Sequence, residues 1–585
     1  MKGAITMNKH FLQQQLAAAD HRIKADLVIK NAKIIDVFTL SILSGDVAIH
    51  DGKFVGIGEY QGINEIDANG RYVSPSFIDS HVHIESSMLI PSEFAKVVVP
   101  HGVTTVITDP HEIANVSGTA GIEFMIQNSK DLPLEVLVGL PSSVPSTPFE
   151  NAGAVLNAEH LEPFLAEKSV IGLAEVMDYP SVQKGADSML DKLLMAKKHH
   201  AIMDGHGAGL DAHGVNIYAT AGIKTDHECV NAQEAMDRLQ RGMYVSIRQG
   251  SVAKDLLNLL PVVNERTARR CLFCTDDKHL DDLLTEGSVD YNVRLAIEHG
   301  LDPLLSIQLA SLNVAECYQL QGRGAIAPGY EADFLLLDDL ETISIHQVYK
   351  SGELVAEKGV LTSLNDQPVL ENPVLTDTVH VKNLTLDDLR LPVKGNRAHI
   401  IGVIPNSLVT NHLVENIQTK NGYFQPSLVD DQLKMLVVER HHETGNIGKG
   451  IVKGFRLKEG AIATTIAHDS HNIVAVGTND EDLLCAIQAI EKMKGGVVIV
   501  KNQEVLSGLP LPISGLMSDL PFQDVLVNLN KLHDALHELE IADHFNPLLT
   551  LSFLSLPVIP HLKLTDMGLF DFNQFKHIKI DEDLV

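Results

Sequence analysis

The middle of the chain repeats one pattern of hydrophobic and polar positions: a short apolar run, a polar loop, then a helical segment. Eight of the apolar runs have the length and composition of strands, namely 72–79, 102–108, 134–140, 170–176, 201–205, 223–227, 243–248 and 271–277. Eight βα units within about 245 residues match the size of a (β/α)8 TIM-like barrel. An open doubly wound sheet is the alternative, but no Gly-x-Gly-x-x-Gly turn follows the first strand.

The segments on either side of this repeat have a different pattern of hydrophobic and polar positions. Residues 22–76 and 323–365 contain short alternating strands separated by Asp-Gly and Gly turns, and they predict a small β-sandwich domain formed from both flanks. The barrel, at 77–322, would be inserted between them. A polar, proline-containing stretch at 364–374 predicts a linker. Strand-like and helical runs then predict a C-terminal α+β domain at 375–585, so the fold class is α/β with two attachments.

Composition narrows the classes of function. The formal net charge is −30, and a surface this acidic repels nucleic acid and anionic lipid. No window approaches 18 uninterrupted apolar residues, so we expect no membrane span. Five cysteines are too few for a disulfide framework, which favours the cytoplasm.

The strongest local signal is Ser80-His81-Val82-His83 at the end of the first predicted barrel strand. Side chains alternate between the two faces of a strand, so His81 and His83 point the same way. Two neighbouring imidazoles suit one divalent metal ion. Taken alone, such a pair is more often two ordinary loop histidines.

Other predicted strand ends carry similar groups: Asp109-Pro110-His111-Glu112, Glu175, His206, His227-Glu228 and Asp276-Asp277. The carboxyl ends of barrel strands meet on one face, where barrel enzymes have their active sites. Four imidazoles and two carboxylates are enough ligands for two metal ions, which would activate water for a hydrolysis. The sequence therefore predicts a binuclear hydrolase.

Seven motifs occur in the order found in the amidohydrolase superfamily: HVHIESSM, ITDPHEIAN, AEVMDYP, GHGAGL, TDHE, SIRQGS and CTDD. Together with the C-terminal segment HHETGNIGKGIVKGF, they closely resemble the adenine deaminase family. The resemblance covers nearly the whole chain beyond the first two dozen residues. It implies hydrolysis of adenine to hypoxanthine and ammonia in purine salvage, and a homodimer as the assembly.

The resemblance also implies roles for individual residues. His81 and His83 would bind the first ion, Glu175 would bridge both ions, and His206 and His227 would bind the second. Asp276 would bind the first ion and relay the proton. Manganese is the ion most expected, with iron or zinc as alternatives.

Further residues remain candidates without a fixed order. Glu85, His111 and Glu228 could protonate a purine ring nitrogen, and Arg248 and Gln249 could bind the base or simply pair with nearby carboxylates.

Two other clusters stay open. Asp109, His111 and Glu112 could form an extra metal site, although loop capping is favoured. The polar run 468–472 could close the active site, lie at an interface or form a plain turn.

Two other functions compete with this interpretation. The chain could be another amidohydrolase that acts on a related heterocycle or cyclic amide. It could also be an inactive protein of this fold used for assembly, but such a protein has no reason to keep all six ligands.

Overall fold

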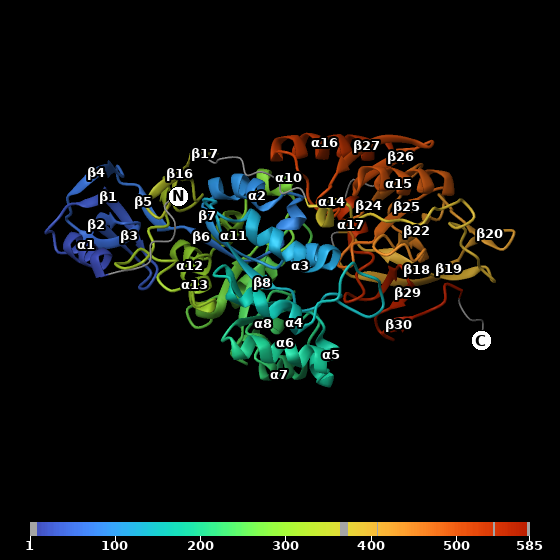
Figure 1. Ribbon diagram of the computed structural model, residues 1–585, viewed down its shortest axis with the longest axis horizontal. Coiled ribbons are helices and arrows are strands. Elements are labelled where there is room, and N and C mark those ends of the chain that lie inside the picture. The colour runs from blue at the N-terminus through green and yellow to red at the C-terminus, as the bar shows by residue number, and fades with distance from the viewer. Residues whose placement is uncertain (1–8, 363–371, 406, 542–544, 582–585) are drawn as a thin grey trace.

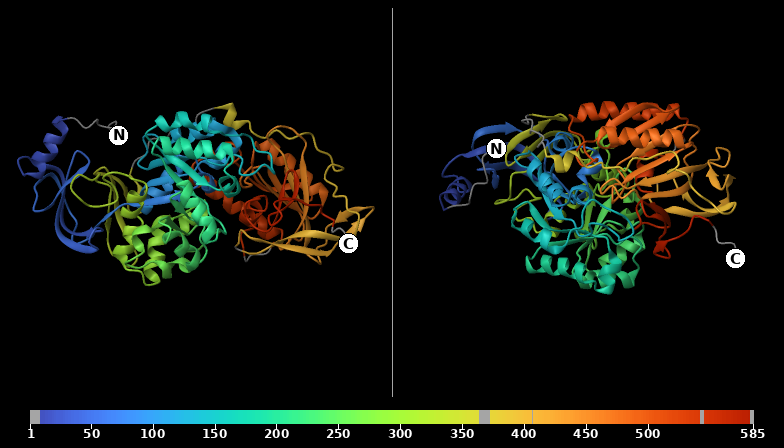
Figure 2. Two further views of the ribbon diagram at one scale, coloured as in Figure 1. Left: turned by 90° about the horizontal axis from the view of Figure 1, so that it is seen from below. Right: turned by 45° about the vertical axis from the view of Figure 1, so that its right-hand side comes forward.

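The computed structural model describes residues 9–362, 372–405, 407–541 and 545–581. Most of the predicted linker, residues 364–371, lies outside this part, as does the end of the 323–365 segment. A small β-domain lies at one end of the elongated molecule, a helix-covered barrel in the middle and the C-terminal domain at the other end (Figures 1 and 2). Within the described residues, no helix is long and apolar enough to cross a membrane. All five cysteines are free.

The central domain is a curled parallel sheet. Strands β6 to β10 form one sheet and β11 to β13 a second, and a parallel bridge between Val82 and Asp276 joins β6 to the segment after β13. The predicted TIM-like class is thus confirmed. The strands are β6 (Phe77–Val82), β7 (Val103–Thr108), β8 (Glu135–Leu140), β9 (Val170–Val176), β10 (Ile202–Gly205), β11 (Thr225–Asp226), β12 (Tyr244–Arg248) and β13 (Cys271–Cys274).

Helices surround this sheet (Figure 1). They include α2 (Pro91–Val98), α3 (His111–Asn128), α4 (Ala158–Leu161), α5 (Tyr179–Lys184), α6 (Asp187–Lys198), α7 (Ala212–Ala221), α8 (Ala232–Leu239), α9 (Leu256–Leu259), α10 (Leu280–Thr285), α11 (Val289–Glu298), α12 (Pro303–Leu309) and α13 (Leu312–Cys317), with the 3-10 turn η1 (Ile84–Ser87) after β6. Apolar side chains from five strands pack with Tyr318 in one buried cluster, namely Ile78, Ile107, Leu137, Ile202 and Leu272.

The first predicted strand, 72–79, is wrong as a single element. Residues Tyr72–Pro75 form β5, which pairs with β1 and β14 in the outer sheet, and the barrel strand β6 begins only at Phe77. Pro75 has no backbone N–H for a continuous ladder, and the chain changes sheets at Ser76. A continuous apolar run could not reveal this change of partners.

The outer domain is one nine-stranded sheet built from both flanks. β14 joins the two flanks because it pairs antiparallel with β5, and α1 (Lys9–Ala19) packs against β2 and β3. The strands are β1 (Ala25–Asp36), β2 (Ser41–His50), β3 (Lys53–Gly58), β4 (Gly62–Asp67), β14 (Phe334–Leu337), β15 (Ile345–Lys350), β16 (Glu353–Glu357) and β17 (Val360–Leu361).

The C-terminal domain contains an eight-stranded sheet in the order β19-β18-β23-β22-β25-β24-β26-β27, mostly antiparallel. Its strands are β18 (Arg397–Val403), β19 (Thr410–Asn416), β22 (Gln432–Val438), β23 (Ile447–Lys453), β24 (Ala461–Thr464), β25 (Ile473–Gly477), β26 (Gly496–Lys501) and β27 (Glu504–Pro510). Its helices are α14 (Pro373–Thr376), α15 (Asp480–Met493), α16 (Phe522–Glu538) and α17 (Pro547–Ser552). Two small sheets complete it: β20 (Gln418–Lys420) with β21 (Tyr423–Gln425), and β28 (Leu562–Thr565) with β29 (Gly568–Asp571) and β30 (Lys576–His577).

The C-terminal domain is bonded to the barrel loops that follow β6, β7 and β8. Asn472 donates to the carbonyl of Asn151 at 2.8 Å, and the amide of Phe522 donates to Glu93 at 3.0 Å. Segments 321 and 429 residues apart therefore meet beside the carboxyl ends of the barrel strands.

Candidate active site

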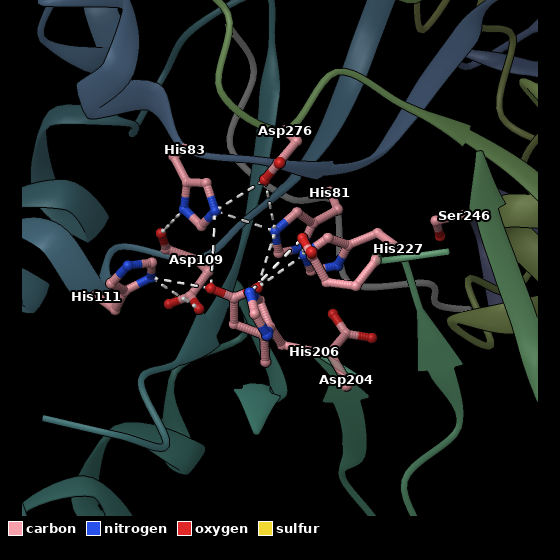
Figure 3. Close-up of polar contacts among 12 residues, drawn as sticks. His81, His83, Asp109, His111, Asp204, His206, His227, Ser246 and Asp276 are labelled. Atoms are coloured by element: carbon pink, nitrogen blue, oxygen red, sulfur yellow. Dashed lines mark hydrogen bonds and ion pairs between the residues drawn. The ribbon is translucent and has the colours of Figure 1, made fainter. Parts of the chain in front are cut away.

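His81 and His83 face each other, as strand alternation predicts. Their Nε2 atoms lie 3.2 Å apart, and the Nδ1 atom of His83 lies 3.0 Å from the carbonyl oxygen of Asp109. Because a carbonyl oxygen only accepts, that Nδ1 carries the proton and His83 Nε2 presents its lone pair to the pocket (Figure 3). A hydrogen bond of this kind, from the ring nitrogen that faces away from the pocket, is typical of a metal-binding histidine.

The carboxylate of Glu175, on β9, lies among the imidazoles. One oxygen is 3.0 Å from His227 Nε2 and 3.6 Å from His81 Nε2, and the other is 3.9 Å from His83 Nε2. A ring nitrogen of His206 also lies close enough to share an ion with Glu175 and His227. One carboxylate thus reaches both histidine pairs.

Asp276 completes the cluster from the segment after β13. Its Oδ1 atom lies 3.1 Å from His83 Nε2 and 3.5 Å from His81 Nε2. Burial would raise the pKa of this carboxyl, but Arg248 and the two imidazoles hold it well below its usual range. Burial is likewise outweighed at Glu175, whose pKa His227 holds well below normal.

These six side chains fit two divalent cations. They offer nitrogen and carboxylate-oxygen donors, and all but His206, which is 12% exposed, are buried. One Glu175 oxygen has no hydrogen-bond partner in the described part of the chain. Buried donors crowded this closely need a cation between them. The chemistry of the set suits manganese, iron or zinc.

Arg238, on α8, supports the loops that carry His206 and His227. Its side chain is completely buried, pairs with Asp226 at 2.8 Å and donates to the carbonyl oxygen of Gly207 at 2.6 Å. Asp226 directly precedes His227, and Gly207 directly follows His206.

Replacing Arg238 by methionine is expected to lower the free energy of unfolding by about 3–5 kcal/mol, because Asp226 is left as an unpaired buried charge. Arg241→Ala, at a partly exposed position that makes a 3.5 Å pair with Asp237 near the end of the same helix, should cost under about 1 kcal/mol. Urea unfolding measures both. Equal losses in the two variants would contradict this assignment.

Arg248 lines the pocket and also pairs with carboxylates. It lies 2.9 Å from Asp276 and 3.4 Å from Asp255, and it donates to Glu228. Gln249 is buried beside this group but is not among the residues that line the pocket.

The structure distinguishes the three residues that the sequence offers as proton donors to a purine ring nitrogen. Glu228 and His111 line the pocket, whereas Glu85 does not. One oxygen of Glu85 accepts the amide N–H of Ile113 at 3.3 Å, so this carboxyl lies behind the pocket at the start of α3.

Asp109, His111 and Glu112, for which the sequence favours loop capping, lie at the start of helix α3. Helix α3 begins at His111 after Pro110, and no side chain of the preceding residue caps it. Asp109 instead lies 3.2 Å from His111 Nδ1. Glu112 also lies 3.1 Å from His468 Nδ1, and His83, His111 and Glu112 lie close enough together to hold an ion.

The C-terminal domain forms one wall of the pocket. His468 and Asp469 line it, and an apolar group faces it: Leu408, Phe553, Leu556, Val558 and Ile559. Of the open interpretations of 468–472, closure of the site agrees with this placement. The apolar residues belong to no recognisable motif, so the sequence offered no signal for them.

Residues 72–355 match the Amidohydrolase family, and residues 407–576 match the Adenine deaminase C-terminal domain. The fold, the cluster of six candidate ligands and these matches define the chain as an amidohydrolase.

The chain is also similar over nearly its whole length to curated adenine deaminases. It is 56% identical over 573 residues to that of Geobacillus kaustophilus, covering 97% of this chain and 99% of that protein. Identity is 51% over 575 residues to that of Bacillus pumilus, with 98% and 100% covered. For Listeria monocytogenes it is 50% over 573 residues, with 98% and 99% covered. The chain belongs to the adenine deaminase family.

Proposed function

We propose that this protein hydrolyses adenine to hypoxanthine and ammonia in purine salvage. The observation that carries the proposal is the convergence of His81, His83, Glu175, His206, His227 and Asp276 on one buried pocket in a chain of the adenine deaminase family. An inactive assembly protein would have no need to keep this set.

His81, His83, Asp276, Glu175, His206 and His227 would hold two divalent ions, with Glu175 shared between them. We propose manganese, with iron or zinc as alternatives. When bound, the ions would lower the pKa of a water molecule and polarise the purine.

Side chains of the pocket transfer the protons of the reaction. Asp276 accepts one proton of the attacking water and passes it to the exocyclic amine, so that the C–N bond breaks and ammonia leaves. The proton that remains on the new hydroxyl group returns to the residue that protonated the neighbouring ring nitrogen. Glu228 or His111 supplies the proton for the neighbouring ring nitrogen, since both line the pocket and Glu85 does not. Arg248 orients Asp276 and Glu228 through its guanidinium group.

Ammonia release from a panel of purines and cyclic amides tests the proposal. Protein loaded separately with Mn²⁺, Fe²⁺ or Zn²⁺ should turn over adenine in preference to the other compounds, and fastest with Mn²⁺. Stripping the ions should remove the activity, because the pocket side chains alone do not generate hydroxide at neutral pH. If adenine is inert while another heterocycle or a cyclic amide is hydrolysed, the substrate assignment is wrong.

We further propose a closed eight-stranded barrel at 77–322, a β-sandwich at 22–76 with 323–365, and an α+β domain at 375–585. We propose a homodimer from the family resemblance and a cytoplasmic location from the scarcity of cysteines, and sedimentation of the purified protein would test the first.

A further inference from the structure

His468 connects the C-terminal domain to the barrel at the active-site pocket. It lies in the segment between β24 and β25, lines the pocket, and is buried to 3% exposure. Its ring stacks on Phe553 with centroids 4.2 Å apart and planes 11° from parallel. The pair presents a flat, preformed surface beside the apolar side chains of the same wall.

Glu112 fixes the orientation of the His468 ring. A Glu112 oxygen lies 3.1 Å from His468 Nδ1, and the hydroxyl of Ser86 donates to the same oxygen at 3.3 Å. Glu112 occupies the first turn of α3, where the helix dipole favours a negative charge. Since Nδ1 is engaged with Glu112, Nε2 is the ring nitrogen that remains for a ligand.

His471 and Arg440 indicate that this arrangement is a hydrogen-bond network rather than a metal site. The amide of Ala467 donates to His471 Nδ1 at 3.2 Å, so His471 Nε2 carries the proton and cannot ligate an ion. Arg440 donates to the carbonyl oxygen of His471 and to that of Ser514, 2.9 Å away, and both the arginine and His471 are fully buried. The segment that carries His468 is thus held rigidly.

We propose that His468 is a substrate-binding residue contributed by the C-terminal domain, and that its Nε2 hydrogen-bonds a ring nitrogen of the purine on the side away from the reacting carbon. This inference rests on the proposed function. The cluster of Glu175 and the histidines occupies the barrel side of the pocket, so the reacting carbon must face it and the opposite edge of the base must face the C-terminal wall. Burial lowers the pKa of His468, but Glu112 raises it to about 9, which leaves Nε2 protonated as a donor.

The test combines variants of His468 with adenine analogues that lack one ring nitrogen: 3-deazaadenine, 7-deazaadenine and 9-deazaadenine. His468→Leu should lower kcat/KM for adenine about 10- to 100-fold, mostly through KM, as expected for loss of one charged hydrogen bond. One analogue should show a similar loss with the wild-type enzyme and no further loss with the variant. His468→Gln, which keeps an N–H donor, should recover part of the activity.

His533→Ala is the matched control, because His533 also joins the C-terminal domain to the barrel, through Asp281 at 3.3 Å, but does not line this pocket. It should leave kcat/KM within about twofold. Equal losses by His468→Leu on adenine and on all three analogues would show a structural role and overturn the inference, as would a loss below threefold. A wild-type enzyme inert towards adenine would overturn the proposed function as well.

Discussion

Replacing Glu175 by glutamine is expected to reduce ammonia release from adenine by about 10³-fold or more and to remove bound metal. This carboxylate reaches both histidine pairs, with its two oxygens 3.0 Å from His227 and 3.9 Å from His83. Glutamine has the same shape but offers one neutral oxygen, and its NH₂ group cannot ligate an ion. Turnover and metal content, measured on the same preparation, test both parts of this expectation.

Glu150→Gln is the matched control for this substitution. Glu150 is buried in the loop after β8, and burial together with Asp469 raises its pKa to about 8, so it is largely protonated at neutral pH. The hydroxyl of Ser146 donates to a Glu150 oxygen at 2.9 Å in the wild type, and the side-chain oxygen of glutamine can accept the same bond. We expect turnover and metal content within about twofold of wild type. Full activity in the Glu175 variant, or in metal-free protein, would contradict the binuclear mechanism.

The ligand cluster could be predicted from the sequence because barrel geometry converts strand order into proximity. His81 and His83 are close in the sequence, but Glu175, His227 and Asp276 are far apart and meet only because parallel strands end at one face. The hydrophobic periodicity locates the strands, and the polar residues directly after each strand are then the candidates for the site. The same reasoning failed at 72–79, because an apolar run does not reveal that two successive strands pair in different sheets.

The C-terminal wall of the pocket could not be found this way. Its position depends on contacts between domains, such as Asn472 with Asn151 and His468 with Glu112, which no local pattern encodes. Phe553 and Ile559 look like ordinary core residues in the sequence. Glu85 lies next to the histidine motif in the sequence, but its carboxyl accepts the amide N–H of Ile113 and does not line the pocket, a placement that the sequence does not reveal.

Asp276→Asn is expected to lower kcat by about 10²- to 10⁴-fold, the range associated with loss of a general acid–base group. Asp276 has a φ of 57°, in the left-handed region, and asparagine is among the few residues that accept this conformation readily. The backbone bond from the Asp276 amide to the carbonyl of His81, at 3.0 Å, should therefore persist. The loss would then report the missing proton acceptor rather than a distorted strand end, and steady-state kinetics with adenine measure it.

The same substitution also removes a partner of Arg248, and Asp255→Asn separates the two effects. Asp255 pairs with the other terminal nitrogen of Arg248 at 3.4 Å but does not line the pocket. If freeing Arg248 caused the loss, both variants would fall by similar factors. If Asp276 carries the proton, Asp255→Asn should lose at most about tenfold, and because the guanidinium keeps Glu228 and Asp276 as partners, the loss should appear in KM rather than in kcat.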